Sequence, residues 1–208
     1  STPIKFGTDG WRSIIADTFT FENVRIAAQA SALCFASVSN TERAVYIGFD
    51  GRFLSPRFAR AAAEVLAGNG FRSRLMDRAY PTPYISFEVL RRGFAGGIVI
   101  TASHNPADFN GFKVKAHFGG SATPGITAEI EKHLGDSPVL SSEKGVEMVA
   151  PGDHYFDHLR SLVDWERISK SRLKVVVDSM HGSGGRMLET LLRDTSCVVE
   201  TRRGNLDP

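Results

Sequence analysis

The hydrophobic pattern alternates between short apolar runs and longer amphipathic segments. Apolar runs of this length predict buried strands, here at residues 44–49, 71–76, 96–100, 173–177 and 198–201. Capping residues followed by helical spacing predict helices that begin near residues 21, 55, 82, 123, 154 and 182. Parallel strands buried on both faces read as unbroken apolar runs. The pattern therefore predicts an α/β fold with a mixed, mainly parallel sheet sandwiched by helices.

One tight turn is predicted at Asn110-Gly111, since this dipeptide favours the positive φ angles of short hairpin turns. Residues 112–116 would then return beside residues 96–100, and this pairing gives the predicted sheet an antiparallel edge. Residues 136–153 combine serine, proline, glycine and charged residues with little periodicity, so we predict a surface connection there.

We expect one complete domain and the beginning of another. Residues 1–150 would form the first domain, and residues 151–208 a linker helix and the truncated start of a second, similar α/β domain. The strand–helix–strand unit from 173 to 208 has 36 residues, too few to bury an independent core. The alternative is a C-terminal βαβ unit that completes the first sheet.

The composition is that of an ordinary globular protein, with 42% hydrophobic and 23% charged residues among 208. A net charge of +2 with scattered arginines indicates no nucleic-acid partner. No stretch approaches the roughly 20 apolar residues of a membrane span, and residues 1–12 lack a signal-peptide core, so no membrane partner is expected.

Cys34 and Cys197 lie in apolar patterns, which predict that both are small buried side chains. Two such cysteines favour a reducing, cytoplasmic setting, and a disulfide between them remains the alternative.

The candidate chemistry centres on Ser103, which lies just beyond the predicted strand 96–100. Open α/β sheets present ligands at the carboxyl ends of their strands, so the serine is placed where a substrate can reach it. His104 follows directly, Asn105-Pro106 bends the chain, and Lys113 brings back a cation after the predicted turn. Small and polar neighbours leave room for a bulky anion, so this segment suits a phosphoryl group.

The same spacing disfavours a serine hydrolase. Adjacent residues in an extended segment point to opposite sides, so His104 is not expected to bond the Ser103 hydroxyl. The sequence also has no Gly-x-Ser-x-Gly elbow around Ser103. On loop composition alone, a polar loop without chemistry remains the other interpretation.

The segment from Thr101 to Lys113, TASHNPADFNGFK, resembles the phosphoserine loop of the α-D-phosphohexomutases. This family includes phosphoglucomutase, phosphomannomutase and phosphoglucosamine mutase. Further segments resemble the family's N-terminal signature, its second turn motif and the start of its second domain, and they lie in the expected order at residues 5–12, 48–52 and 175–182. The resemblance covers nearly the whole chain and makes residues 1–150 the domain that carries the phosphoserine loop.

The resemblance implies that Ser103 carries a phosphoryl group and donates it to a free hydroxyl of a hexose phosphate substrate. The intermediate, a hexose 1,6-bisphosphate, turns over and returns its other phosphate to Ser103. The net reaction moves phosphate between the 1- and 6-positions. The resemblance also implies Mg²⁺, which would contact Ser103 through its phosphate, with the aspartate ligands outside this chain.

Further roles follow from the resemblance, residue by residue. Lys113 matches the position given a role in proton transfer and transition-state stabilisation, and a plain phosphate-binding cation is its alternative. Arg12 matches a catalytic cation near the phosphoserine. His104, a further catalytic candidate, and Asn105 would shape the loop and contact phosphate or substrate. Arg52 would order a neighbouring loop and belongs with the phosphate-binding residues.

The family's Asp-x-Asp-x-Asp-Arg metal loop has no counterpart in the sequence. We therefore expect the remaining domains of the parent protein to supply the metal ligands and sugar recognition, and this chain alone to have little turnover. A catalytically silent sugar-phosphate-binding or regulatory module remains an alternative. So does phosphoglucosamine mutase, although residues 6–12 and 117–127 look closer to phosphoglucomutase and phosphomannomutase.

Overall fold

The computed structural model describes residues 4–7 and 10–207 of the chain, which divides into two compact units between Ala150 and Pro151. Among the described residues, the first unit forms a six-stranded sheet. The order across the sheet is β1 (Trp11–Ile14), β5 (Phe109–Ala116), β4 (Phe94–Ile100), β2 (Glu42–Phe49), β3 (Arg72–Met76) and β6 (Val146–Val149).

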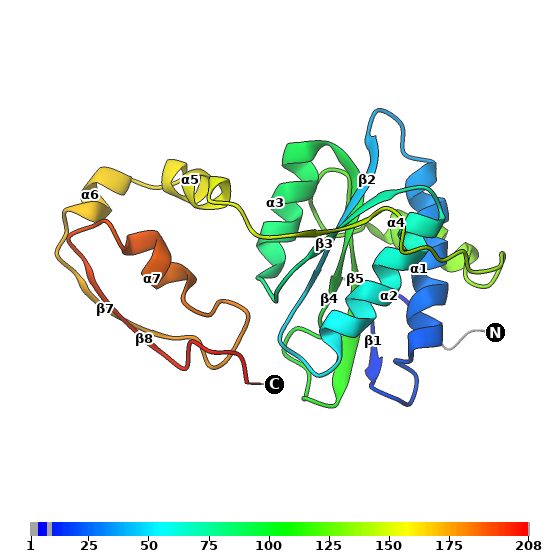
Figure 1. The fold of residues 1–208 in the computed structure, drawn as a ribbon, viewed down its shortest axis with the longest axis horizontal. Helices are drawn as coiled ribbons and strands as arrows, with labels where there is room; N and C mark the ends of the chain where they lie inside the picture. The colour runs from blue at the N-terminus through cyan, green and yellow to red at the C-terminus, as the bar shows by residue number, and fades with distance from the viewer. Residues whose placement is uncertain (1–3, 8–9, 208) are drawn as a thin grey trace. The chain divides into compact units, whose positions relative to one another are not determined.

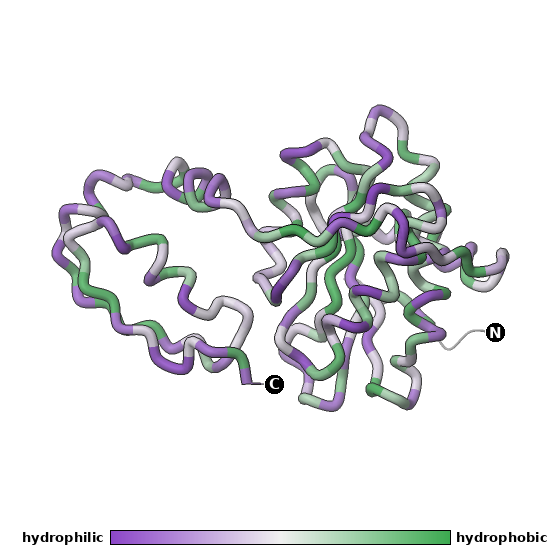
Figure 2. The backbone as a smooth tube through the Cα atoms, viewed as in Figure 1, coloured by the Kyte–Doolittle hydropathy of each residue, from purple (hydrophilic) through white to green (hydrophobic). Residues whose placement is uncertain are grey.

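Helices cover both faces of this sheet (Figure 1). On one face lie α1 (Phe21–Ala36) and α2 (Ser55–Gly68), and α4 (Pro124–Lys132) packs on α1. On the other face lies α3 (Thr82–Arg92), which contacts β4, β2 and β5. The hydrophobic positions follow the central strands (Figure 2). This confirms the predicted α/β fold with helices on both faces of the sheet.

The sheet is mixed, as predicted. Strands β2, β3, β4 and β6 pair in parallel, whereas β5 pairs antiparallel with both β4 and β1. The carboxyl ends of β2 and β4 are therefore neighbours at one edge of the sheet. The loops that follow these two strands meet there, and the candidate site is built from them.

Two adjacent glycines let the helices approach the central strand β4, which is buried along its whole length. A Cβ atom on Gly96 would overlap the ring of Phe35 from α1. A Cβ on Gly97 would lie 2.8 Å from Cγ2 of Val89 in α3. Because successive residues of a strand face opposite sides, the pair clears space on both faces at once.

Two sequence predictions for the first unit need correction, and one strand was not predicted. Asn110 and Gly111 do not form a turn, because both lie inside β5. The buried Asn110 side chain instead donates to the Ser55 hydroxyl at 2.9 Å, and the chain reverses in the loop 101–108. Residues 136–153 are not only a surface connection, because they contain β6. Strand β1 was not predicted. Strands β1 and β6 are four-residue edge strands with partly exposed side chains, so neither has an apolar run that would identify it.

The second unit contains α5 (His154–Ser161), α6 (Trp165–Ser169), β7 (Lys174–Asp178), α7 (Met187–Leu192) and β8 (Val198–Arg202). Strands β7 and β8 pair in parallel. Val176 and Val198 of this pair are 62% and 63% exposed. Parallel sheets are normally covered on both faces, so this pair leaves apolar surface open to solvent.

The two cysteines differ in their surroundings. Cys34 is buried in α1, as predicted, whereas Cys197 is half-buried, and both are free thiols. Burial raises the pKa of Cys34. The Ser171 hydroxyl, 3.4 Å from the Cys197 sulfur, lowers the pKa of Cys197. Among the described residues, no helix combines the length and apolar character needed to cross a membrane.

Gly96→Ala should lower the free energy of unfolding by about 2 kcal/mol, because the added methyl group overlaps the Phe35 ring. The matched control is Gly125→Ala in α4, where the nearest atom to an added Cβ is the Thr123 hydroxyl oxygen at 3.9 Å. This control should raise stability by about 0.5 kcal/mol, since alanine favours helix. Urea unfolding measures both, and equal effects of the two substitutions would contradict the packing described for β4.

Cys197 should react with iodoacetamide before Cys34, and its labelling should begin at a lower pH. The lowered pKa increases the thiolate fraction of Cys197, whereas the raised pKa and burial protect Cys34. Brief labelling near neutral pH followed by peptide mapping measures the order. Ser171→Ala should slow the reaction of Cys197 alone. An unchanged Cys197 rate in that variant would show that the Ser171 contact does not set its pKa.

Candidate active site

Ser103 lies in the loop 101–108 that joins β4 to β5, at the carboxyl edge of the sheet, and it is exposed. The loop continues the β4–β5 pairing for one further step, because the Thr101 amide donates to the Gly111 carbonyl oxygen at 2.9 Å. Beyond that bond the two strands separate. The Ser103 hydroxyl therefore lies outside the packed core, where a substrate can reach it.

The backbone of Ser103 is left-handed, with φ of 59°. This conformation is uncommon outside glycine, and its energetic cost has to be offset by surrounding contacts. Two local hydrogen bonds contribute: the Ser103 amide donates to the Thr101 hydroxyl at 3.1 Å, and the Asn105 amide donates to the Ala102 carbonyl at 3.1 Å. The loop is thus a defined turn rather than an extended segment.

This turn corrects one prediction about His104. The Ser103 hydroxyl and His104 Nδ1 lie 3.5 Å apart, although an extended chain would have separated them. The contact is at the outer limit of hydrogen bonding. Among the described residues, no hydrogen bond orients the other nitrogen of the His104 ring. A nucleophile–base pair needs such an orienting group, so this contact does not make a hydrolase site.

The Arg52 side chain holds the loop through its backbone. Its Nη1 donates to the carbonyl oxygens of Pro106 and Phe109 at 2.6 and 3.1 Å. Its Nη2 donates to the carbonyl oxygens of Ser103 and Asn105 at 3.1 and 2.6 Å. We call Arg52 with these carbonyl groups the Arg52 clamp. The Arg52 side chain is 16% exposed, so little water competes for these bonds.

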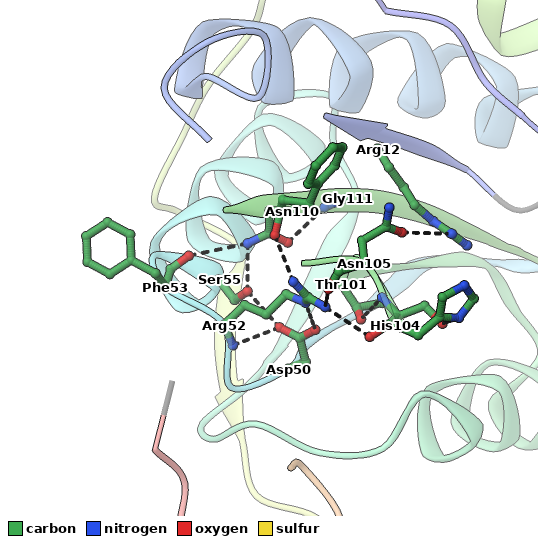
Figure 3. A network of polar contacts seen from close by, with 12 residues as sticks. Arg12, Asp50, Arg52, Phe53, Ser55, Thr101, His104, Asn105, Asn110 and Gly111 are labelled. Atoms are coloured by element: carbon green, nitrogen blue, oxygen red, sulfur yellow. Dashed lines mark hydrogen bonds and ion pairs between the residues drawn. The ribbon is translucent and has the colours of Figure 1, made fainter. Parts of the chain in front are cut away.

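Asp50 fixes the Arg52 clamp from behind (Figure 3). Its Oδ2 lies 3.4 Å from the Arg52 Nε, and its Oδ1 accepts from the Arg52 amide at 3.0 Å. The same Oδ1 accepts from the Ser55 hydroxyl at 2.8 Å, and Ser55 in turn accepts from Asn110. This chain ties the turn after β2, the start of α2 and the start of β5 together behind the loop.

Arg12 reaches the loop from β1. It lies opposite Gly111 of β5, and its Cγ is 3.1 Å from the point where a Gly111 side chain would begin. The absence of that side chain lets Arg12 cross β5 and donate from Nη1 to the Asn105 side-chain oxygen at 3.1 Å. Among the described residues, the remaining N–H groups of its guanidinium have no hydrogen-bond partner.

Lys113 lies in β5 opposite Val99 and is 7% exposed. It is two residues beyond Gly111, so it faces the same side of the sheet as Gly111 and Arg12. The structure thus gathers Ser103, His104, Asn105 and the two arginines in one cluster. Lys113 lies on the adjoining strand, on the Arg12 side.

Sequence reasoning missed Asp50, Ser55 and Asn110 as supports of this site. The sequence could have indicated only part of this arrangement. Asp50 and Arg52 belong to one turn motif, but nothing in the sequence links them to Asn110. The described residues do not form a metal cage. In the part of the chain that the structure describes, no three His, Cys, Asp or Glu side chains are grouped as metal ligands. The nearby carboxylate of Asp50 is occupied by Arg52 and Ser55.

Comparison with known proteins decides the family. Residues 3–138 match the model for the phosphoglucomutase/phosphomannomutase α/β/α domain I, and residues 153–208 match the model for domain II. The chain belongs to the phosphoglucomutase/phosphomannomutase family. The family signatures noted in the sequence agree with these matches.

Individual relatives agree with this assignment. A phosphoglucomutase from Staphylococcus saprophyticus subsp. saprophyticus is 32% identical over 211 residues, which cover 92% of this chain and 37% of that protein. A protein from Schizosaccharomyces pombe, named provisionally as a phosphoribomutase, is 34% identical over 201 residues, covering 87% of this chain and 34% of that protein. The chain therefore spans little more than a third of the length of these curated relatives.

A solved structure shows the same fold. A protein from Thermus thermophilus, named provisionally as a phosphomannomutase, superposes with a TM-score of 0.92 at 33% identity. The match covers 100% of this chain and 47% of that one. Both units of this chain thus have counterparts in one solved protein.

Arg52→Met should lower the free energy of unfolding by about 2 kcal/mol, because the loop carbonyls lose their donor and Asp50 loses its cation. Hydrogen exchange at the loop amides, that of Asn105 above all, should become faster. The control is Arg78→Met, which removes an exposed arginine paired with Asp77 and should change stability by less than about 0.5 kcal/mol. Unchanged loop exchange in Arg52→Met would show that the clamp does not order the loop.

Proposed function

We propose that this chain carries the phosphoryl-transfer part of a phosphohexomutase, with Ser103 as the residue that gives and takes the phosphoryl group. One observation carries the proposal. An exposed serine with a strained backbone is held by the Arg52 clamp at the edge of the sheet, and the Arg12 guanidinium beside it has N–H groups without a partner among the described residues. Strain of this kind is retained where the surrounding contacts impose it, and it clusters at functional sites.

In the first half-reaction, the bond between phosphorus and the Ser103 oxygen breaks, and a bond to a sugar hydroxyl oxygen forms. The sugar hydroxyl gives its proton to a base, and the serine oxygen takes up one proton and becomes a hydroxyl, so the number of protons is unchanged. The second half-reaction reverses these steps at the other phosphate of the hexose 1,6-bisphosphate. Little covalent work is needed from the protein, so positioning and charge stabilisation carry the rate.

The side chains around Ser103 then have separate tasks. The guanidinium of Arg12 stabilises charge on the transferred phosphoryl group, and Asn105 orients that guanidinium. Lys113 moves the proton or binds phosphate from the same face of the sheet. His104 contacts the serine hydroxyl weakly and lies where it can bind phosphate or sugar. Arg52 acts through the loop backbone rather than on phosphate, because its guanidinium is occupied by carbonyl groups.

The Mg²⁺ implied by the family resemblance does not fit a cage made from the described residues. Residues 151–208 are proposed to begin a second domain, a view supported by the domain II match and by the exposed Val176 and Val198. Remaining domains of the parent protein would then supply the metal ligands and the sugar-recognition loops. We place this mutase in the cytoplasm.

In the parent protein, hexose 1,6-bisphosphate should transfer one phosphoryl group to Ser103, and Ser103→Ala should prevent the transfer. Intact-mass measurement and peptide mapping detect the added group and its position. The matched control is Ser141→Ala, which removes another exposed serine hydroxyl and should leave uptake unchanged. Phosphate uptake that persists in Ser103→Ala would contradict the assignment.

The turnover assay tests the complete reaction in the parent protein. Conversion of glucose 1-phosphate, coupled to glucose-6-phosphate dehydrogenase, should fall to background in Ser103→Ala, and the 208-residue chain alone should show little turnover. The Schizosaccharomyces pombe relative makes ribose 1-phosphate the competing substrate to assay alongside. A preference for ribose 1-phosphate would replace the hexose assignment but keep Ser103 as carrier.

A further inference from the structure

A pocket lies in the first unit, on the face of the sheet that α1 and α2 cover. Its volume is about 620 Å³, within the usual range for sites of small organic molecules. Its floor includes Phe49, Leu75 and Met148, at or near the carboxyl ends of β2, β3 and β6. Neither Ser103 nor Arg12 lines it, so it is separate from the candidate active site.

Two guanidinium groups converge on one aromatic ring at this pocket. The Cζ atoms of Arg25 and Arg57 lie 5.9 and 5.3 Å from the ring centroid of Phe21, and all three residues line the pocket. Phe21 is itself supported from within, since its centroid lies 4.4 Å from that of Phe58. The stacking limits the positions of both guanidinium groups while leaving their N–H edges available.

The pocket has more positive charge than its carboxylates neutralise. Arg60 is paired with Glu64 at 3.0 Å, and Asp77 is paired with Arg78 at 2.9 Å. Among the described residues, no carboxylate forms an ion pair with Arg25 or Arg57. Two fixed cations thus stand beside an apolar floor, and this combination favours an anion that carries an apolar group.

We propose that this pocket binds an organic phosphate with a flat aromatic ring, of the nucleoside monophosphate class. The two guanidinium groups suit a phosphate, because each presents a planar pair of donors. The floor suits the ring, because Met148 and Leu75 offer apolar contacts and a methionine sulfur packs well against aromatic edges. This site is independent of phosphoryl transfer at Ser103 and goes beyond the function proposed above.

Titration of the 208-residue chain with adenosine monophosphate tests the proposal by isothermal calorimetry. One saturable site is expected, and Arg25→Met and Arg57→Met should each weaken binding by about tenfold. The control is Arg43→Met, which removes an arginine stacked on Phe71 at 4.9 Å, outside the pocket, and should leave affinity unchanged. Met148→Asp provides a further variant, because Met148 is 52% exposed and a new carboxylate there repels phosphate without disturbing the core.

Several outcomes overturn the proposal. Absence of saturable binding up to about 10 mM would exclude a specific site. Equal affinity for inorganic phosphate and adenosine monophosphate would show that the ligand's aromatic ring does not contact the apolar floor. An affinity for adenosine monophosphate that is unchanged in Met148→Asp would show that the ligand binds elsewhere. Ser103→Ala should retain full affinity. Loss of binding in that variant would assign the ligand to the active site instead, whereas failure of the Ser103 assignment would leave this pocket unaffected.

Discussion

The guanidinium of Arg52 and the carbonyl oxygens that it binds determine the shape of the candidate active site. A loop that leaves a sheet edge has backbone groups without ladder partners, and these are costly when solvent cannot reach them. The Arg52 clamp supplies donors for the carbonyls of Ser103, Asn105, Pro106 and Phe109 at once. Asp50 holds the guanidinium in place, so the loop is fixed by a neighbouring turn rather than by its own sequence.

The fold could be predicted largely from the sequence, because its core strands are apolar runs between segments with helical spacing. The runs that became β2, β3 and β4 stand out for this reason. The edge strands β1 and β6 were missed, since a four-residue strand with exposed side chains is defined by backbone pairing alone. The error at Asn110 has a related cause: local preference favours a turn there, but a buried side-chain bond to Ser55 keeps it in a strand.

The sequence predicted which residues gather at the candidate site, but it did not predict the geometry of the loop that holds them. Ser103, Arg12, Arg52 and Asn105 were all identified from the sequence, and the structure brings them together. The left-handed backbone of Ser103 was not predictable, because it depends on contacts from Arg52, which is distant in the sequence. The role of Gly111 was not predictable either, because it depends on the strand register. Only the pairing of β5 with β1 shows that the Arg12 side chain passes over Gly111.

A double-mutant cycle on Asp50 and Arg52 tests most directly whether these residues act as one unit to present Ser103. The measured quantity is the rate at which Ser103 of the parent protein accepts phosphate from a hexose 1,6-bisphosphate, with the wild-type sequence, Asp50→Asn, Arg52→Lys and both substitutions together. The account predicts that the double variant is about as slow as the slower single variant, with a coupling of about 1.5 kcal/mol. If the two single substitutions raise the activation free energy by amounts that add up in the double variant, the account is contradicted. Additive effects would mean that Asp50 and Arg52 act on the loop independently.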